Sequence, residues 1–116
     1  MEKVVEKIRR EMRMGFYALL TLKLLRDRGE LHGYGIRSEI KRLSGGALNP
    51  SEGTIYELLK LLGKKGLIES YWVVSSTGRA RKMYRITPLG AEVYKRLCPD
   101  LAAFKKIIEY LLEGCA

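Results

Sequence analysis

The sequence predicts a mainly α-helical protein of one domain that carries a single β-hairpin. Apolar residues recur at helical spacing along most of the chain, with glycine or proline between the segments. Between Ile68 and Thr87 the pattern changes to the β-branched, aromatic and alternating residues of strands. The chain has 116 residues, which suffices for one hydrophobic core but not for two independent domains.

A long helix is expected at the N-terminus, from Val4 to Arg28, followed by a turn at Gly29-Glu30. Its apolar residues cover more than the single stripe of a surface helix, and they are Phe16, Tyr17, Leu19, Leu20, Leu22, Leu24 and Leu25. This helix is therefore expected to be buried on two sides or to be shared with a second subunit.

Two shorter helices are expected to follow. The first has helically spaced apolar residues at Ile36, Ile40 and Leu43, and Ser44-Gly45-Gly46 ends it. The second begins after the capping sequence Asn49-Pro50-Ser51 and ends at Gly66. Its apolar face consists of Ile55, Leu58, Leu59 and Leu62.

The hairpin is expected to pair Ile68–Val74 with Met83–Thr87 around a polar tip, Ser75 to Gly78. Thr87-Pro88 offers a capping hydroxyl and a proline at the first position of another helix. Pro99 is expected to interrupt that helix, and a last helix is expected from Asp100 to Glu113. The predicted order is helix, helix, helix, strand, strand, helix, helix.

Two short helices followed by a hairpin form a winged helix-turn-helix, in which the second helix enters the DNA major groove and the hairpin is the wing. The net charge of +9 indicates a polyanionic partner, nucleic acid first and an anionic membrane surface second. No acidic residue lies between Glu69 and Glu92, whereas that stretch contains Arg79, Arg81, Lys82 and Arg85. Such a wing favours phosphate contact over a merely solvated turn.

The second short helix is expected to turn a polar face toward DNA. That face carries Gly53, Glu57, Lys60 and Lys64, with Tyr56 at its flank. Gly53 would let the backbone approach a phosphate, and Ser51 and Thr54 would donate to phosphate near the helix N-terminus. Tyr56 and Lys60 would reach bases or backbone, while Glu57 either accepts from cytosine or faces solvent.

Four separated strings occur in order along the chain. They are His32-Gly33-Tyr34-Gly35-Ile36, then Pro50-Ser51-Glu52-Gly53-Thr54-Ile55-Tyr56, then Leu59-Lys60 with Lys65-Gly66-Leu67-Ile68-Glu69, then Tyr84-Arg85-Ile86-Thr87 with Gly90. In these strings, between Gly15 and Leu97, the chain resembles the PadR family of transcriptional regulators. The resemblance implies a dimeric winged-helix repressor that joins its subunits through the N- and C-terminal helices and binds palindromic operators. Some members of that family respond to phenolic or other aromatic effectors.

Three residues depart from the family's pattern. Gly63 stands where members usually carry Glu, Leu61 replaces a polar or basic residue, and Pro99 falls within what is commonly a longer C-terminal helix. Glycine in a helix interior costs about 1 kcal/mol relative to alanine, so the second short helix is expected to end early.

These patterns define the expected sites. The expected DNA-binding residues are Tyr34, Ser51, Glu52, Thr54, Tyr56, Lys60, Lys64, Arg79, Arg81 and Lys82. A small aromatic effector is expected near Trp72 and Phe104, with core packing as the more common role of such a strand tryptophan. Residues 1–97 are expected to form the winged helix-turn-helix with its N-terminal helix, and residues 98–116 a dimerisation helix of the same domain.

Several other functions are not supported by the residues. His32 is expected to cap or pack rather than bind metal, and Cys98 and Cys115 to be structural or free thiols. No catalytic residue, metal site or cofactor is predicted, because the carboxylates are scattered among basic neighbours. The expected partners are a pseudo-palindromic DNA operator and a second copy, in a cytoplasmic protein with no membrane span. The alternative is a winged-helix module that binds another protein without specific DNA binding.

Overall fold

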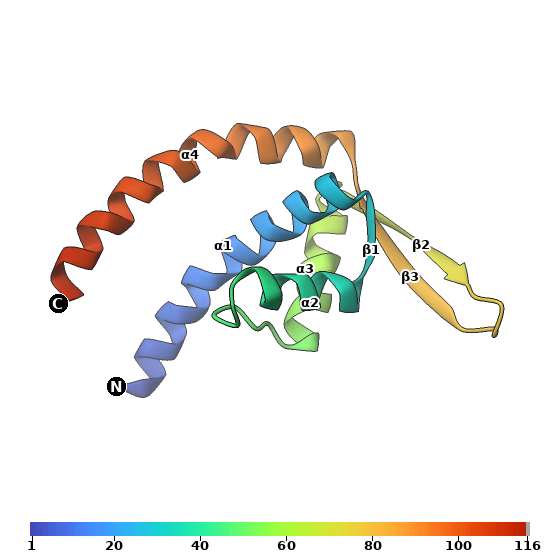
Figure 1. The fold of residues 1–116 in the computed structure, drawn as a ribbon, viewed down its shortest axis with the longest axis horizontal. Coiled ribbons are helices and arrows are strands. Elements are labelled where there is room, and N and C mark those ends of the chain that lie inside the picture. Colours follow the sequence, from blue (N-terminus) through green and yellow to red (C-terminus); the bar gives the residue numbers. More distant parts are fainter. Residues whose placement is uncertain (116) are drawn as a thin grey trace.

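The computed structural model describes residues 1–115 of the chain, so Ala116 of the predicted C-terminal segment lies outside it. The elements follow in the order α1 (Glu2–Arg28), β1 (Glu30–His32), α2 (Gly33–Leu43), α3 (Glu52–Lys64), β2 (Ile68–Val74), β3 (Ala80–Ile86), α4 (Pro88–Leu112) and the 3-10 turn η1 (Glu113–Cys115). Figure 1 shows α2 and α3 on one side of α1, α4 on the other side, and the β2–β3 hairpin projecting at one end. The predicted fold class, mainly α with a hairpin wing, is confirmed.

Side chains cap the helices where the sequence predicts it. The Ser51 hydroxyl accepts from the Thr54 amide at 3.1 Å, and the Thr87 hydroxyl accepts from the Gly90 amide at 3.0 Å. His32 caps α2, because its Nδ1 accepts from the Gly35 amide at 3.0 Å. The expectation that His32 caps a helix is therefore confirmed. Gly29, with φ 87°, ends α1 in a conformation that favours glycine.

The sheet has three strands: of the turn predicted at Gly29-Glu30, Gly29 does turn the chain at the end of α1, whereas Glu30 is already the first residue of β1. β1 pairs antiparallel with β3, where Leu31 lies opposite Tyr84, and β3 is the central strand of the order β1-β3-β2. The prediction of two strands was wrong because a three-residue strand shows no alternation of its own. Its stability comes from the partner strand that the tertiary fold places beside it.

The second hairpin strand begins at Ala80, earlier than the predicted Met83. Its first residues are exposed and carry no apolar alternation, yet the register with β2 continues through Trp72 opposite Lys82 to Val74 opposite Ala80. The tip closes through the Ser75 amide, which donates to the Arg79 carbonyl at 2.8 Å. Backbone pairing therefore defines this part of the strand, and side-chain burial does not.

α4 continues through Pro99, so the predicted interruption there was wrong. A proline inside a helix removes one backbone hydrogen bond and bends the helix without necessarily ending it. Figure 1 shows α4 as a long arc whose C-terminal half extends beyond the helix-turn-helix. The predicted division at residues 97 and 98 thus falls within one continuous helix, and it stays a prediction. α3 likewise does not end early, because it runs past Gly63 to Lys64.

The core forms where α1, α2 and α3 meet the sheet. Its buried residues include Tyr17, Leu22, Leu24, Leu25, Ile36, Ile40, Ile55, Leu58, Leu59, Leu62, Ile68, Tyr84 and Tyr94. α4 contributes little to this core, since only Gly90 and Tyr94 of that helix are buried. The Arg26 guanidinium lies 5.0 Å from the centre of the Tyr94 ring and covers it.

No helix of residues 1–115 is long and apolar enough to cross a membrane. Cys98 and Cys115 are free and exposed, as expected of unpaired thiols. Within the same residues, no group of three or more His, Cys, Asp or Glu side chains is placed to hold a metal ion.

Gly90 joins α4 to the sheet at a point where no side chain fits. A Cβ added there would lie 2.0 Å from the Leu67 carbonyl oxygen, which already accepts from the Thr87 amide. We expect Gly90→Ala to lower the free energy of unfolding by about 3 kcal/mol, because a backbone must move. Urea denaturation measures this change.

Gly63→Ala is the matched control. Its added Cβ would meet nothing within 4 Å, and α3 continues around it. We expect this variant to gain about 1 kcal/mol, the usual difference between alanine and glycine inside a helix. A Gly90→Ala protein as stable as the unchanged chain would contradict the close approach of α4 to Leu67.

Candidate nucleic-acid interface

The position of α3 is fixed by its contacts with α2 and by the loop between the two helices. Ile36 and Ile40 of α2 and Ile55 of α3 are almost completely buried. The Arg37 side chain donates from Nε to the carbonyl of Pro50 at 2.7 Å, which ties α2 to the residue just before the α3 cap. Ser44 closes the other end of the loop, because its hydroxyl accepts from the Leu48 amide at 2.9 Å.

The N-terminus of α3 has a hydroxyl pair rather than two independent donors. The Ser51 hydroxyl accepts from the Thr54 amide and donates to the Thr54 Oγ1 at 2.9 Å. The Thr54 hydroxyl proton therefore has no intramolecular acceptor in this pair and can be donated to a ligand. Ser51 serves mainly as the cap, so its predicted phosphate contact would need the cap to open. Glu52 and Gly53, in the first turn, are exposed.

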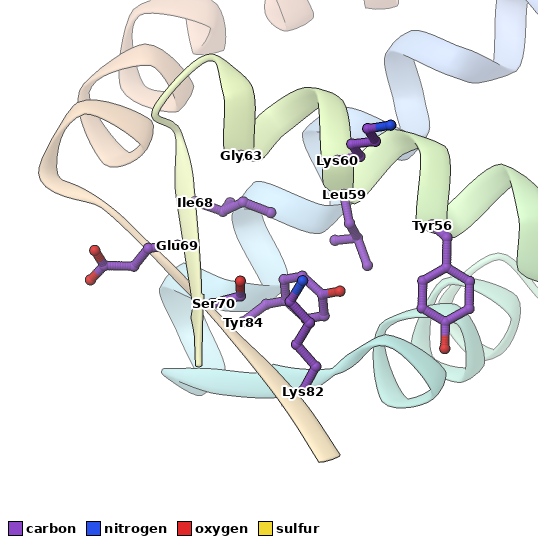
Figure 2. Close-up of a pocket in the computed structure, with 9 residues that line it drawn as sticks. All are labelled: Tyr56, Leu59, Lys60, Gly63, Ile68, Glu69, Ser70, Lys82 and Tyr84. Carbon is purple, nitrogen blue, oxygen red and sulfur yellow. The ribbon is translucent and has the colours of Figure 1, made fainter. Parts of the chain in front are cut away.

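A groove of about 420 Å³ lies between α3 and the hairpin. Figure 2 shows Lys82 and Tyr84 standing between the strands and α3, with Tyr56 toward α2 and Gly63 at the opposite end. Lys60 also lines this groove from α3, whereas Lys64 lies one turn beyond it on the exposed surface. Burial raises the pKa of the Tyr84 hydroxyl above its ordinary value, so this ring stays neutral at physiological pH.

A second hollow, of about 480 Å³, continues from this groove toward the N-terminus of α2. It is lined by aromatic rings, among them Tyr34, Tyr56 and Trp72, together with Arg81 and Lys82. The Lys82 ammonium lies 5.9 Å from the ring centres of both Trp72 and Tyr84. Five of the ten predicted DNA-binding residues therefore line one continuous concave surface, and they are Tyr34, Tyr56, Lys60, Arg81 and Lys82. Ser51 and Thr54 line a separate groove beside α1, whereas Glu52, Lys64 and Arg79 line neither of the two hollows.

Trp72 is 65% exposed, so the expectation that it packs in the core was wrong. The hairpin projects beyond the helices, and no element covers this face of β2 near its end. The structure also does not bring Trp72 together with Phe104 within one chain. β2 and the C-terminal half of α4, which carry these residues, lie at opposite ends of the molecule (Figure 1).

The wing arginines differ in what they contact. Arg79 and Arg81 are exposed and have no acidic partner within residues 1–115. Arg85 instead donates from Nε to Glu69 at 2.7 Å and lies 5.2 Å from the centre of the Tyr71 ring. The hydrogen bond that Arg85 donates to Glu69 raises the pKa of Arg85 above its ordinary value. Arg85 is thus part of a solvent-exposed cluster of side chains that contact one another, on the face of the sheet opposite Tyr84.

The Arg85 cluster includes a contact that the sequence did not suggest. The Tyr71 hydroxyl donates to the Glu30 carboxylate, and this hydrogen bond raises the pKa of Tyr71. Glu30 belongs to β1, the strand missing from the prediction. Its position opposite Arg85 could therefore not be predicted from the sequence either. The pairing of residues 30 and 85 could have been suggested only by a signal for a third strand.

The fold and this surface define a winged-helix protein of the kind found among transcriptional regulators. Residues 21–96 match the model of the "Transcriptional regulator PadR-like family". This chain belongs to that family, as its sequence motifs predict. A relative from Lysinibacillus sphaericus, named Uncharacterized protein X, is 38% identical over 96 residues, which is 83% of this chain and 85% of the relative.

Two solved structures extend the comparison. A transcriptional regulator from Clostridium thermocellum is 32% identical, with a TM-score of 0.76, and the match covers 86% of this chain and 93% of that one. Bacillus subtilis PadR in complex with operator DNA is 33% identical, with a TM-score of 0.61, over 68% of this chain and 44% of that one. This chain therefore matches less than half of that longer protein.

Proposed function

We propose that this chain is a sequence-specific DNA-binding regulator that represses transcription as a homodimer bound to a pseudo-palindromic operator. One observation carries the proposal: exposed α3 residues and an unpaired basic wing line the same concave surface. The similarity to Bacillus subtilis PadR, whose structure contains operator DNA, supports a duplex as the ligand of this surface. The protein-interaction alternative lacks such support, because a wing rich in unpaired cations fits a polyanion.

Each predicted DNA-binding residue receives a role in this proposal. Arg79, Arg81 and Lys82 contact phosphates from the wing, where their charges are free of acidic partners. Tyr56 and Lys60 face the groove and read bases from α3. Tyr34, Thr54 and Lys64 contact phosphate or sugar. Ser51 acts as the cap that holds the N-terminus of α3, and Glu52, whose carboxylate would repel a phosphate, accepts from a cytosine amino group.

Selection of binding sites from random duplexes at fixed salt tests the proposal. We expect a recovered palindrome with half-site centres about one helical turn, roughly 34 Å, apart. Arg79→Ala and Arg81→Ala should each weaken binding to all sequences and lower the salt dependence by about one charge. Tyr56→Ala should also relax the base preference within each half-site, because it removes a side chain that faces the bases.

Arg96→Ala is the control for these variants. Arg96 lies on α4 and is paired with Glu92, so its loss should leave both affinity and salt slope unchanged. Recovery of no consensus, together with tight capture of a protein partner, would favour the interaction module. Wing variants with the salt slope of the unchanged chain would show that the phosphate contacts are assigned wrongly.

A homodimer is supported by apolar side chains that the single chain leaves exposed. They lie on the N-terminal half of α1 and the C-terminal half of α4, and include Val4, Ile8, Met12, Phe16, Phe104, Ile107, Ile108 and Leu111. These halves extend away from the core on the side opposite the wing (Figure 1). An apolar surface of this extent is typical of a subunit interface, and it leaves the wing and α3 free for DNA.

Sedimentation equilibrium tests the dimer. We expect twice the chain mass of 13.2 kDa, and a dissociation constant raised by about 100-fold or more in Ile108→Glu, because the interface would bury an unpaired charge. Leu61→Glu is the matched control, since Leu61 on α3 is 47% exposed and Ile108 is 45% exposed. A monomeric unchanged chain, or equal dissociation constants for the two variants, would contradict this interface.

A small aromatic effector would bind, in this proposal, in the hollow beside Trp72 and compete with DNA. Tyr34 and Tyr56 supply rings for stacking, and Lys82 supplies a cation for a phenolate or carboxylate. Phe104 takes part only if a second subunit brings it there. Simple phenolic acids should quench the fluorescence of Trp72, the single tryptophan, and release a bound duplex. A flat titration with DNA binding intact would exclude such an effector site.

A further inference from the structure

A third hollow, of about 520 Å³, lies on the flank of α3 opposite the wing. It is called the α1-side groove below, and the groove between α3 and the hairpin is called the wing-side groove. The walls of the α1-side groove are the N-terminal half of α1 and the first two turns of α3 with the residues before them. Arg10 and Arg13 line it from α1, and Thr54 and Glu57 line it from α3. Tyr17, which is buried, forms its floor toward the core.

The charges in this groove are unevenly paired. Glu6 forms an ion pair with Arg9, which lies three residues later on α1. Arg10 and Arg13 form no ion pair within residues 1–115, and Glu57 is the remaining carboxylate of the groove. Lys3 lies seven residues before Arg10 on the same face of α1 and adds to the positive charge beyond the groove. With Glu6 paired to Arg9, the groove holds two unpaired arginines against one unpaired carboxylate, Glu57.

The placement of these arginines relative to α3 identifies their partner. Tyr56 and Lys60 border the wing-side groove, whereas Thr54 and Glu57 border the α1-side groove, so the outer face of α3 lies between the two. A helix in the major groove is bordered by a phosphate backbone on either side, because that groove is about 12 Å wide. The wing supplies cations on one side only. Arg10 and Arg13 supply them on the other, next to the Thr54 hydroxyl, whose proton has no acceptor in the Ser51–Thr54 pair.

We propose that Arg10 and Arg13 bind DNA phosphates on the side of the recognition helix away from the wing. The Thr54 hydroxyl donates to the same backbone strand, and the guanidinium groups provide the charge-assisted hydrogen bonds. This inference rests on the proposed DNA-binding function and enlarges its contact surface. In a dimer joined through α1 and α4, these phosphates lie between the two recognition helices, while the wing phosphates lie outside them.

Salt titration of the full-length chain tests this assignment on a selected operator and on an unrelated duplex. The double variant Arg10→Gln/Arg13→Gln should bind both duplexes at least about tenfold more weakly. Its plot of log Kd against log salt should lose about two charges per protomer. The base preference found by selection should stay that of the unchanged chain, because phosphates carry no sequence information.

Ethylation interference locates the contacts. In the unchanged chain, ethylation of phosphates between the half-sites should block binding, and this sensitivity should disappear in the double variant. In Arg79→Ala/Arg81→Ala the outer phosphates should lose their sensitivity instead. The two patterns separate the α1 contacts from the wing contacts.

The matched control is Lys95→Gln/Arg96→Gln, which removes the same net charge from exposed residues in the N-terminal half of α4, outside the proposed subunit interface. Its binding should equal that of the unchanged chain. Because Arg13 is half-buried, Arg10→Gln alone and Arg13→Lys serve as variants that keep the fold, and circular dichroism checks all of them. The salt dependence of binding should fall by about one charge in Arg10→Gln and should stay that of the unchanged chain in Arg13→Lys.

The outcomes separate the two proposals. If the unchanged chain selects an operator but the arginine variants retain its affinity and salt slope, the α1 contact is overturned while the proposed function stands. If the unchanged chain shows no sequence preference, the proposed function fails. In that case, the slope of log Kd against log salt on the unrelated duplex still decides whether Arg10 and Arg13 contact phosphate, because the double variant should have the smaller slope.

Discussion

The packing of α2 and α3 against α1 is the constraint on which the rest of the structure depends. The five most deeply buried side chains, Thr21, Leu25, Ile36, Ile40 and Ile55, all come from these three helices. The one polar member is satisfied internally, because the Thr21 hydroxyl donates to the Tyr17 carbonyl at 2.8 Å. Since this core uses one face of α3 completely, the opposite face is left in solvent beside the hairpin.

The central strand β3 connects that core to the wing. Tyr84 is buried against the helices, while Lys82, two residues earlier on the same face, already lies in the open groove. Because side chains two residues apart lie on the same face of a strand, one face of β3 runs from the core at Tyr84 to the groove at Lys82. The other face of the strand holds Arg85 in contact with Glu69, and Arg81, four residues earlier on that same face, has no acidic partner within residues 1–115.

Paired and unpaired cations also lie in different parts of the whole molecule. Many arginines pair with neighbouring carboxylates, as Arg42 and Arg28 both do with Glu39. The cations that border α3, from the wing and from α1, lack such partners within the described chain. A net charge of +9 is therefore less informative than its distribution, which leaves unpaired positive charge on both flanks of one exposed helix.

The sequence by itself determined the helices, their caps and the hairpin, because apolar periodicity, Ser51, Thr87 and the glycines act over a few residues. The family motifs likewise predicted the fold and the family correctly. Only the tertiary structure decided the features that depend on distant partners: the pairing of β1 with β3, the exposure of Trp72, and the approach of Arg10 and Arg13 to α3. α4 continues through Pro99 because a long helix can lose one hydrogen bond and bend. Such features depend on the balance of contacts across the fold, which local spacing does not encode.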